Sequence, residues 1–333
     1  MVGFDDGAET ARFLNNAQVP EINANLTTST DLTTAKSLPE NTGLCFMGPS
    51  PKAPFDIDGD LAGEMIRAPL NINGRPNTDV VRPVFSGVDI VQGWRGKWTI
   101  DLDIESEVEA SQYQMPFEYV KQHVYPIRIG NRRQDFSNRW WQYARPRPGL
   151  RCALEGKRRF IATPAVSRHR IFVWVRPEVL CNQGTIVFAR EDDYFFGMLH
   201  SRPHELWALS MGTQLREFES GFRYTPTTTF ETFPFPWPPG TEPTGDPRVE
   251  AIANAARELV EKRDAWLNPQ GASETDLKKR TLTNLYNQRP TWLDMAHKRL
   301  DDAVLDAYGW PHDLSDEEIL ERLLTLNLER EPA

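Results

Sequence analysis

The alternation of hydrophobic and polar residues predicts short strands in the first two thirds of the chain. Residues 97–104 alternate from Trp98 onward, and residues 170–176 form a run of β-branched and aromatic side chains. Both stretches are therefore predicted to be strands. The first hundred residues consist of short extended pieces between turn signals such as Asn41-Thr-Gly43 and Asn73-Gly-Arg75, and no long helix is predicted there.

Helices are predicted between and after these strands. Residues 114–125 and 131–143 are predicted to be helical or irregular, and a longer helix is predicted from Asp192 through Ser210. Residues 233–240 then hold four prolines within six residues, which excludes a helix and a central strand. We interpret this proline-rich stretch as a domain boundary.

The remainder of the chain has helical periodicity throughout. Asp246-Pro247 supplies a cap and a first-turn proline for a helix that ends near Trp266, and helices follow at residues 276–287 and 291–308. A last helix begins at Ser315-Asp-Glu-Glu318, which has the spacing of a capping box. The predicted fold class is α+β, with a mixed, β-rich domain over residues 1–240 and a small all-α domain over residues 241–333.

Composition places the chain among globular proteins. It has 333 residues, 39% hydrophobic and 26% charged, and no stretch approaches the roughly 18 apolar residues of a membrane helix. Its three cysteines are widely spaced and form no C-x-x-C motif, which is typical of a reducing compartment. We therefore expect a cytoplasmic protein without a membrane partner.

Charge is distributed unevenly along the sequence. The net charge is -9, but residues 1–120 carry 8 basic and 18 acidic residues, whereas residues 121–224 carry 18 basic and 9 acidic ones. The basic segment is rich in arginine, which makes forked contacts with phosphate and guanine. Any surface for nucleic acid is therefore predicted within residues 121–224, although a solvated basic face of no special function has the same composition.

Sequence motifs for catalysis and metal binding are scarce. Neither G-x-G-x-x-G nor G-x-x-x-x-G-K-[ST] occurs, which argues against a phosphate-binding loop. His200 and His204 have the i,i+4 spacing of a helical metal pair, with Asp192 or Asp193 as further ligands, but Pro203 disturbs the turn. We predict no catalytic residue and no metal site. A metal-dependent enzyme with an unrecognised site and a remnant for protein interaction remain the alternatives.

Several stretches in order carry a resemblance to a known family: residues 77–90, 98–101, 159–164, 193–202 and 223–236. Together they resemble the target-recognition domain of MmeI-type, type IIL-like adenine-specific DNA methyltransferases, which are large restriction-modification and phage-defence enzymes. Residues 314–330 look like the C-terminal helical domain of the same family. The resemblance implies that double-stranded DNA is the partner.

The resemblance also implies roles for individual residues. In the family, base-reading positions lie shortly before an Arg-Tyr-[Ser/Thr] motif, here Arg223-Tyr-Thr225, so Arg216, Glu217 and Glu219 are predicted to read bases, with exposed loop charges as the alternative. A second set is expected at the DNA backbone, with packing or an exposed strand edge as its alternative: Arg145, Arg147, Arg168, His169, Arg170, Arg223 and Tyr224.

One family feature is not found in this sequence. The family carries a Rossmann-like methyltransferase domain with an Asn-Pro-Pro-Tyr type motif, whereas Pro238-Pro239 follows Trp237 here. We therefore expect a C-terminal fragment, a split-gene subunit or a truncated reading frame that cannot methylate DNA alone. No cofactor is expected in this chain, because S-adenosylmethionine belongs to the methyltransferase domain. A separate methyltransferase subunit is a further candidate partner.

Overall fold

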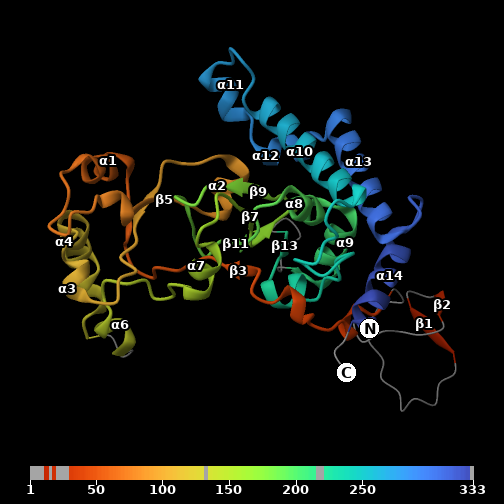
Figure 1. Cartoon of the computed structure of the whole chain (residues 1–333), viewed down its shortest axis with the longest axis horizontal. Coiled ribbons are helices and arrows are strands. Elements are labelled where there is room, and N and C mark those ends of the chain that lie inside the picture. The colour runs from red at the N-terminus through yellow and green to blue at the C-terminus, as the bar shows by residue number, and fades with distance from the viewer. Residues whose placement is uncertain (1–10, 15–16, 20–29, 131–133, 215–220, 331–333) are drawn as a thin grey trace.

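The computed structural model describes residues 11–14, 17–19, 30–130, 134–214 and 221–330. Figure 1 shows a first lobe on the left, a central body of strands and short helices, and long helices along the other side. The strands lie mainly in the middle of the chain and the C-terminal part is helical, so the predicted α+β class is confirmed. None of the described helices is both long and apolar enough to cross a membrane.

The first lobe is built around a mixed four-stranded sheet. The strand order is β10 (Leu180–Cys181), β5 (Val81–Phe85), β6 (Trp98–Ile100) and β4 (Asp56–Ile57), and only the β10–β5 pair is parallel. Its own core buries Phe55, Ile100, Val120 and Trp140. The helices of this lobe are α1 (Gly59–Arg67), α3 (Glu107–Ala110), α4 (Gln114–His123), α5 (Tyr125–Arg128) and α6 (Gln134–Asn138).

Helix α1 is a short helix of nine residues in the region where the sequence predicted no long helix. Asp58 is its N-cap, and the Asp58 carboxylate accepts a hydrogen bond from the Leu61 amide at 2.9 Å. The helix buries Ala62 and Met65 against the sheet. The neighbouring glycines at positions 59 and 63 obscure the helical periodicity in the sequence, because glycine is a poor helix former.

The central body contains an antiparallel four-stranded sheet. Its order is β3 (Cys45–Met47), β11 (Thr185–Phe188), β7 (Phe160–Pro164) and β9 (Val173–Val175). Every residue of β7 and β11 is buried, so both faces of the sheet are covered. The short helices α2 (Gly87–Gln92) and α7 (Pro148–Leu154) belong to this body, and α8 (Asp193–His200) packs on it.

The remaining described strands form two smaller sheets. β12 (Thr213–Gln214), β13 (Phe222–Arg223) and β8 (Val166–Ser167) form an antiparallel sheet with β13 in the middle. β1 (Arg12–Leu14) and β2 (Ala17–Val19) form a separate antiparallel pair. The β8–β13 pair joins segments that lie more than fifty residues apart, which no local sequence signal predicts.

The helices of the last third follow the predicted boundaries closely. They are α10 (Pro247–Leu267), α11 (Glu274–Lys279), α12 (Leu282–Gln288), α13 (Thr291–Tyr308) and α14 (Asp316–Glu329). The capping box at Ser315 and Glu318 is present. One predicted helix is divided at Thr281, which caps α12. The helix predicted from Asp192 is likewise divided at Ser201, which ends α8 and caps α9 (Arg202–Met211).

The hydrophobic core is continuous across the proline-rich stretch. Phe233 and Phe235 are buried in the same cluster as Phe195 of α8, Leu259 of α10 and Leu300 of α13. The prolines thus accompany aromatic side chains that fill the space between the sheet and the C-terminal helices. The domain boundary at residue 240 stays a sequence prediction, because the packing does not separate the two parts there.

Candidate nucleic-acid interface

The β8–β13 edge, defined here as residues 166–168 and 221–223, carries two exposed arginines. Arg168 follows β8 and Arg223 ends β13, and neither forms an ion pair with a described acidic residue. Arg223 also lines a cleft of about 480 Å³. The opposite side of this cleft contains residues 86–88 and Val91 of the α2 region and the loop 182–184. An exposed guanidinium beside an open cleft can reach phosphate or a base edge.

Two glycines allow the backbones around this cleft to approach closely. Gly221 has a φ of +78°, and a Cβ atom there would lie 2.3 Å from the Ser167 carbonyl oxygen. A Cβ atom on Gly87 would lie 2.7 Å from the Gly184 carbonyl oxygen. Both distances are too short for any side chain, so these positions require glycine. The shape of the cleft therefore depends on backbone contacts between distant segments.

Arg170 and Tyr224 are buried, which favours the packing alternative over a place at the DNA backbone. Arg170 donates to the Pro164 carbonyl at 2.6 Å and to the Phe222 carbonyl at 3.0 Å, so it ties β7 to β13. Burial lowers the pKa of Arg170 to about 10, which still leaves it charged at neutral pH. The Tyr224 hydroxyl lies 2.9 Å from His204 Nε2. In this structure both side chains are packing groups.

His169 lies between the exposed and the buried residues of this segment. It is half-buried, and its Nε2 donates to Asn287 Oδ1 of α12 at 2.7 Å. Its ring is also 6.0 Å from that of Tyr286. His169 is therefore tied to the C-terminal helices, and a direct contact with DNA stays a prediction.

Arg145 and Arg147 lie on the segment that leaves the first lobe. Arg145 is exposed, and its backbone forms a bridge with Ser50 through two hydrogen bonds of 3.0 Å. Arg147 is half-buried and has a left-handed φ of +60° at the start of α7. Their contact with DNA stays a prediction. The predicted base-reading residues Arg216, Glu217 and Glu219 lie outside the described residues, between β12 and β13 in the chain.

The candidate metal ligands are engaged in other contacts. His204 Nδ1 donates to the Leu199 carbonyl at 2.8 Å, so its Nε2 accepts from Tyr224. Burial lowers the pKa of His204 to about 3 and keeps it neutral. His200 Nε2 lies 3.1 Å from Arg263 Nη1. Within the described ranges no three His, Cys, Asp or Glu side chains are grouped to hold a metal ion.

The two aspartates of the same hypothesis also have structural partners. Asp192 is the N-cap of α8 and accepts from the Phe195 amide at 2.8 Å. Asp193 pairs with Arg159 at 2.8 Å and with Arg257 at 3.2 Å. Asp192 and Asp193 thus have partners other than His200 and His204. The structure therefore adds no support to the hypothesis that these four side chains bind a metal ion.

The β8–β13 edge lies within a stretch of the chain that a protein-family model matches. A model of the family described as MmeI, target recognition domain, matches residues 67–237, just over half of the chain. The chain belongs to this family. DNA methyltransferase A of Bacillus subtilis (strain 168) is 33% identical over 135 residues, which are 40% of this chain and 13% of that protein.

A solved structure has the same fold as this member of the MmeI target recognition family. It is the type IIL restriction-modification enzyme MmeI in complex with DNA, with a TM-score of 0.71 and 18% identity. The match covers 94% of this chain and 39% of that one. The chain thus spans less than half the length of either relative.

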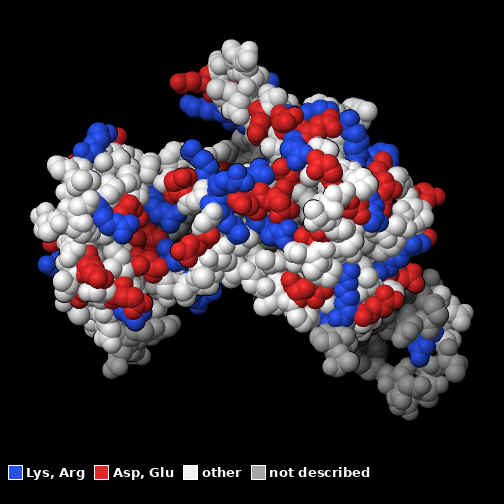
Figure 2. Space-filling model, in the orientation of Figure 1, with Lys and Arg blue, Asp and Glu red and all other residues white. Residues whose placement is uncertain are grey.

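Several arginines of the basic segment in this target recognition region form ion pairs. Arg159 stacks 3.7 Å from the Trp174 ring centre besides its contact with Asp193, and Arg190 contacts both Asp192 and Glu242. Figure 2 shows blue side chains gathered over the central body around α2, β7 and β9, with red ones among them. The charge count of the sequence therefore overstates the basic surface that is free to meet a phosphate backbone.

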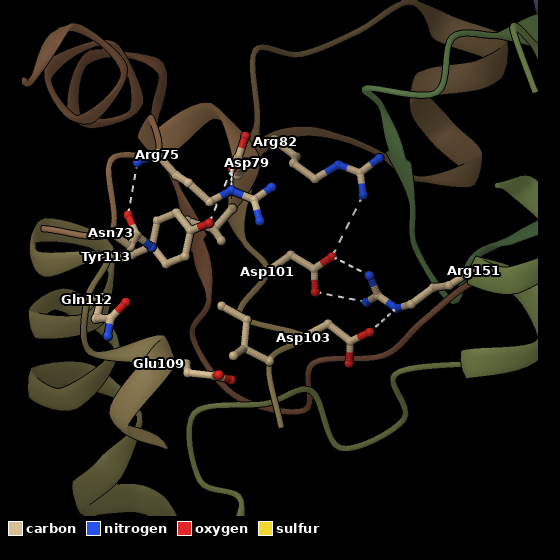
Figure 3. Close-up of a pocket in the computed structure, with 12 residues that line it drawn as sticks. Asn73, Arg75, Asp79, Arg82, Asp101, Asp103, Glu109, Gln112, Tyr113 and Arg151 are labelled. Carbon is tan, nitrogen blue, oxygen red and sulfur yellow. Dashed lines mark hydrogen bonds and ion pairs between the residues drawn. The ribbon is translucent and has the colours of Figure 1, made fainter. Parts of the chain in front are cut away.

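The first lobe contains a polar cleft that no sequence motif predicted. It has a volume of about 490 Å³. Figure 3 shows Arg82 and Arg151 directed at Asp101, with Asp103 beside Arg151. Arg151 Nη1 lies 2.7 Å from Asp101, and Arg151 Nε lies 2.9 Å from Asp103. Burial raises the pKa of Asp103. Asp101 and Asp103 follow β6 of the first lobe, whereas Arg151 lies in α7 of the central body. These ion pairs therefore join the first lobe to the central body.

Proposed function

We propose that this chain is the sequence-specific, double-stranded DNA recognition module of an adenine-N6 DNA methyltransferase used in restriction-modification or phage defence. The observation that carries the proposal is the family match over residues 67–237. These residues contain Arg223, which lines an open cleft, and the exposed Arg168, which lies two residues after Val166 of the same lining. The DNA complex of MmeI, whose fold matches, adds support. We also propose a cytoplasmic location, where such an enzyme meets DNA.

DNA recognition and methyl transfer are separable tasks in such an enzyme. The target adenine must leave the duplex and enter a reaction pocket, while the surrounding bases are read by groups in the grooves. We propose that the present residues perform the reading, with Arg216, Glu217 and Glu219 facing bases. Methyl transfer would then depend on a methyltransferase domain or subunit outside them.

The test of DNA recognition is selection from a pool of random duplexes at two salt concentrations, followed by sequencing of the bound fraction. An enriched motif that contains adenine at both concentrations supports the proposal. Binding that collapses with salt and enriches nothing reveals only electrostatic attraction to phosphate, and it contradicts sequence-specific recognition by this chain. Salt-insensitive protein binding without DNA affinity would favour the interaction-remnant hypothesis.

If methyl transfer takes place outside these residues, the chain should not respond to S-adenosylmethionine. A ligand stabilises a folded protein only if the folded state binds it, and saturation at a hundred times Kd contributes about 2.7 kcal/mol. We expect no change in melting temperature when millimolar S-adenosylmethionine is added to this chain. A clear upward shift would show a donor site here and would overturn the proposed division.

A further inference from the structure

Helix α12 contacts one wall of the cleft at the β8–β13 edge and the segment that follows Ala165 and Val166 of the other wall. On one side Asn287 Oδ1 accepts from His169, which directly follows the exposed Arg168. On the other side the Thr283 hydroxyl donates to the Val91 carbonyl at 3.3 Å and accepts from Gln92 Nε2 at 3.0 Å. Figure 1 shows α12 beside α2, and the two helices are in contact. One helix thus touches two segments far apart in the sequence.

The contact with His169 acts on the segment that presents Arg168. The Ser167 hydroxyl donates to the His169 carbonyl at 2.7 Å, and Ser167 pairs with Phe222 in the β8–β13 sheet. Holding the His169 side chain therefore fixes the turn in which Arg168 lies. Arg168 has no described acidic partner that would fix its direction instead.

The contact with Val91 acts on the opposite wall. Val91 and Val88 of α2 line the cleft together with Arg223, so the position of α2 sets the distance between the walls. Helix α2 has only six residues and is anchored at its other end by the capping box of Ser86 and Asp89. A short helix held at one end by its cap gains a defined orientation from a second contact.

Helix α12 is itself firmly held. Leu282, Leu285 and Tyr286 are buried, and the Tyr286 hydroxyl lies 3.0 Å from His297 Nε2 of α13. The polar side chains of Thr283 and Asn287, one turn apart, therefore project from a fixed base. A rigid element that contacts two surface segments can set their spacing.

We propose that α12 is a positioning element for DNA readout, in which Asn287 holds the segment that carries Arg168, next to the cleft, and Thr283 holds the α2 wall of the cleft. The inference rests on the proposed function, because it assigns the C-terminal helices a part in the recognition of DNA. It predicts that sequence preference depends on two residues outside the matched region 67–237.

The experiment compares variants of the full chain in their preference for the selected duplex over a scrambled one. Asn287→Ala and Thr283→Val each remove one hydrogen-bonding group, and we expect the affinity ratio to fall about five- to tenfold. Asn287→Asp and Thr283→Ser retain the oxygen and should restore the ratio. Gln288→Ala is the matched control, since Gln288 is exposed on the same helix. Unchanged ratios in both Asn287→Ala and Thr283→Val overturn the proposal.

Hydrogen exchange without DNA separates this inference from the proposed function. Amides of residues 166–170 should exchange faster in Asn287→Ala, and those of residues 86–92 faster in Thr283→Val, relative to Gln288→Ala. If the wild-type chain shows no sequence preference, the proposed function fails, while faster exchange still supports α12 as the element that holds the walls. Exchange that matches the control in both variants overturns that role.

Discussion

At the scale of single residues, burial decides whether a charged or titratable side chain acts on the surface or within the fold. Arg168 and Arg170 are two positions apart, yet the first is exposed and the second is enclosed by carbonyl oxygens. Asp301 accepts a hydrogen bond from the Arg202 amide at 2.7 Å, and burial raises its pKa to about 7. Neither difference is visible from residue type.

Asp301 gives a prediction about pH. Its folded pKa of about 7 lies above that of an unfolded aspartate, so the folded state binds the proton more tightly and stability falls as pH rises from about 4 to 7. Asp301→Asn keeps the acceptor oxygen and removes this loss. Between about pH 4 and pH 7 we expect the free energy of unfolding of Asp301→Asn to rise relative to that of the wild type, by at most about 4 kcal/mol. Urea unfolding at several pH values measures it, and parallel pH profiles would refute it.

The exposed arginines give a prediction about salt dependence. Each phosphate contact contributes about 0.9 to the slope of log K against log salt on duplex DNA. Arg168→Ala and Arg223→Ala should each weaken binding and lower that slope by about one unit. Lys298→Ala, on the exposed face of α13, serves as the control. Slopes equal to that of the control in both variants would remove these arginines from the backbone contact.

At the scale of elements, the short strands β8 and β13 depend on close approach of their backbones. Gly221 meets the Ser167 carbonyl where a Cβ atom cannot fit, whereas Gly43 has a similar φ of +79° with no atom within 4 Å of its position. Both glycines have a positive φ, and they differ only in whether neighbouring atoms leave room for a Cβ atom. A comparison of Gly43 with Gly221 therefore separates the need for a positive φ from the need for close backbone approach.

Substitution of the two glycines tests this distinction. Gly43→Ala should cost only the backbone strain, about 1 kcal/mol. Gly221→Ala should cost clearly more, because the β8–β13 pair must also move apart. Chemical denaturation gives both free energies of unfolding. Equal losses would mean that the segment around Gly221 yields without cost.

At the scale of the whole molecule, the sheet and the C-terminal helices share one core. Gly197 of α8 lies so close to α10 that a Cβ atom there would be 2.7 Å from Ile252 Cγ2. Phe235 stacks on Phe195 with ring centres 5.2 Å apart, and both are fully or almost fully buried. The helices therefore complete the core of the sheet.

A chain of residues 1–240 tests this shared core. Without α10 and α13, the aromatic cluster around Phe195 loses its cover, so we expect residues 1–240 to lose cooperative unfolding or to aggregate. Calorimetry of the full chain is the reference. A cooperative transition of residues 1–240 at the melting temperature of the full chain would establish residue 240 as a domain boundary.

The sequence by itself determined the elements whose signals are local. Asp246-Pro247 and the capping box at Ser315 fixed the starts of α10 and α14, because caps and periodicity act over a few residues. Strands β6 and β9 lie within the stretches predicted for them. The ordered motifs that resemble the target-recognition family likewise lie in the sequence, and the family match confirms them.

Only the tertiary structure decided which charges are free and which segments meet. The pairing of β8 with β13, the burial of Arg170 and the contact of Asn287 with His169 join positions 6 to 118 residues apart. Composition records that an arginine is present, but its partners depend on chain segments brought together by the shared core. For this reason the sequence predicted only a basic segment, and the fold leaves Arg168 and Arg223 exposed at the β8–β13 edge without an ion pair to a described acidic residue.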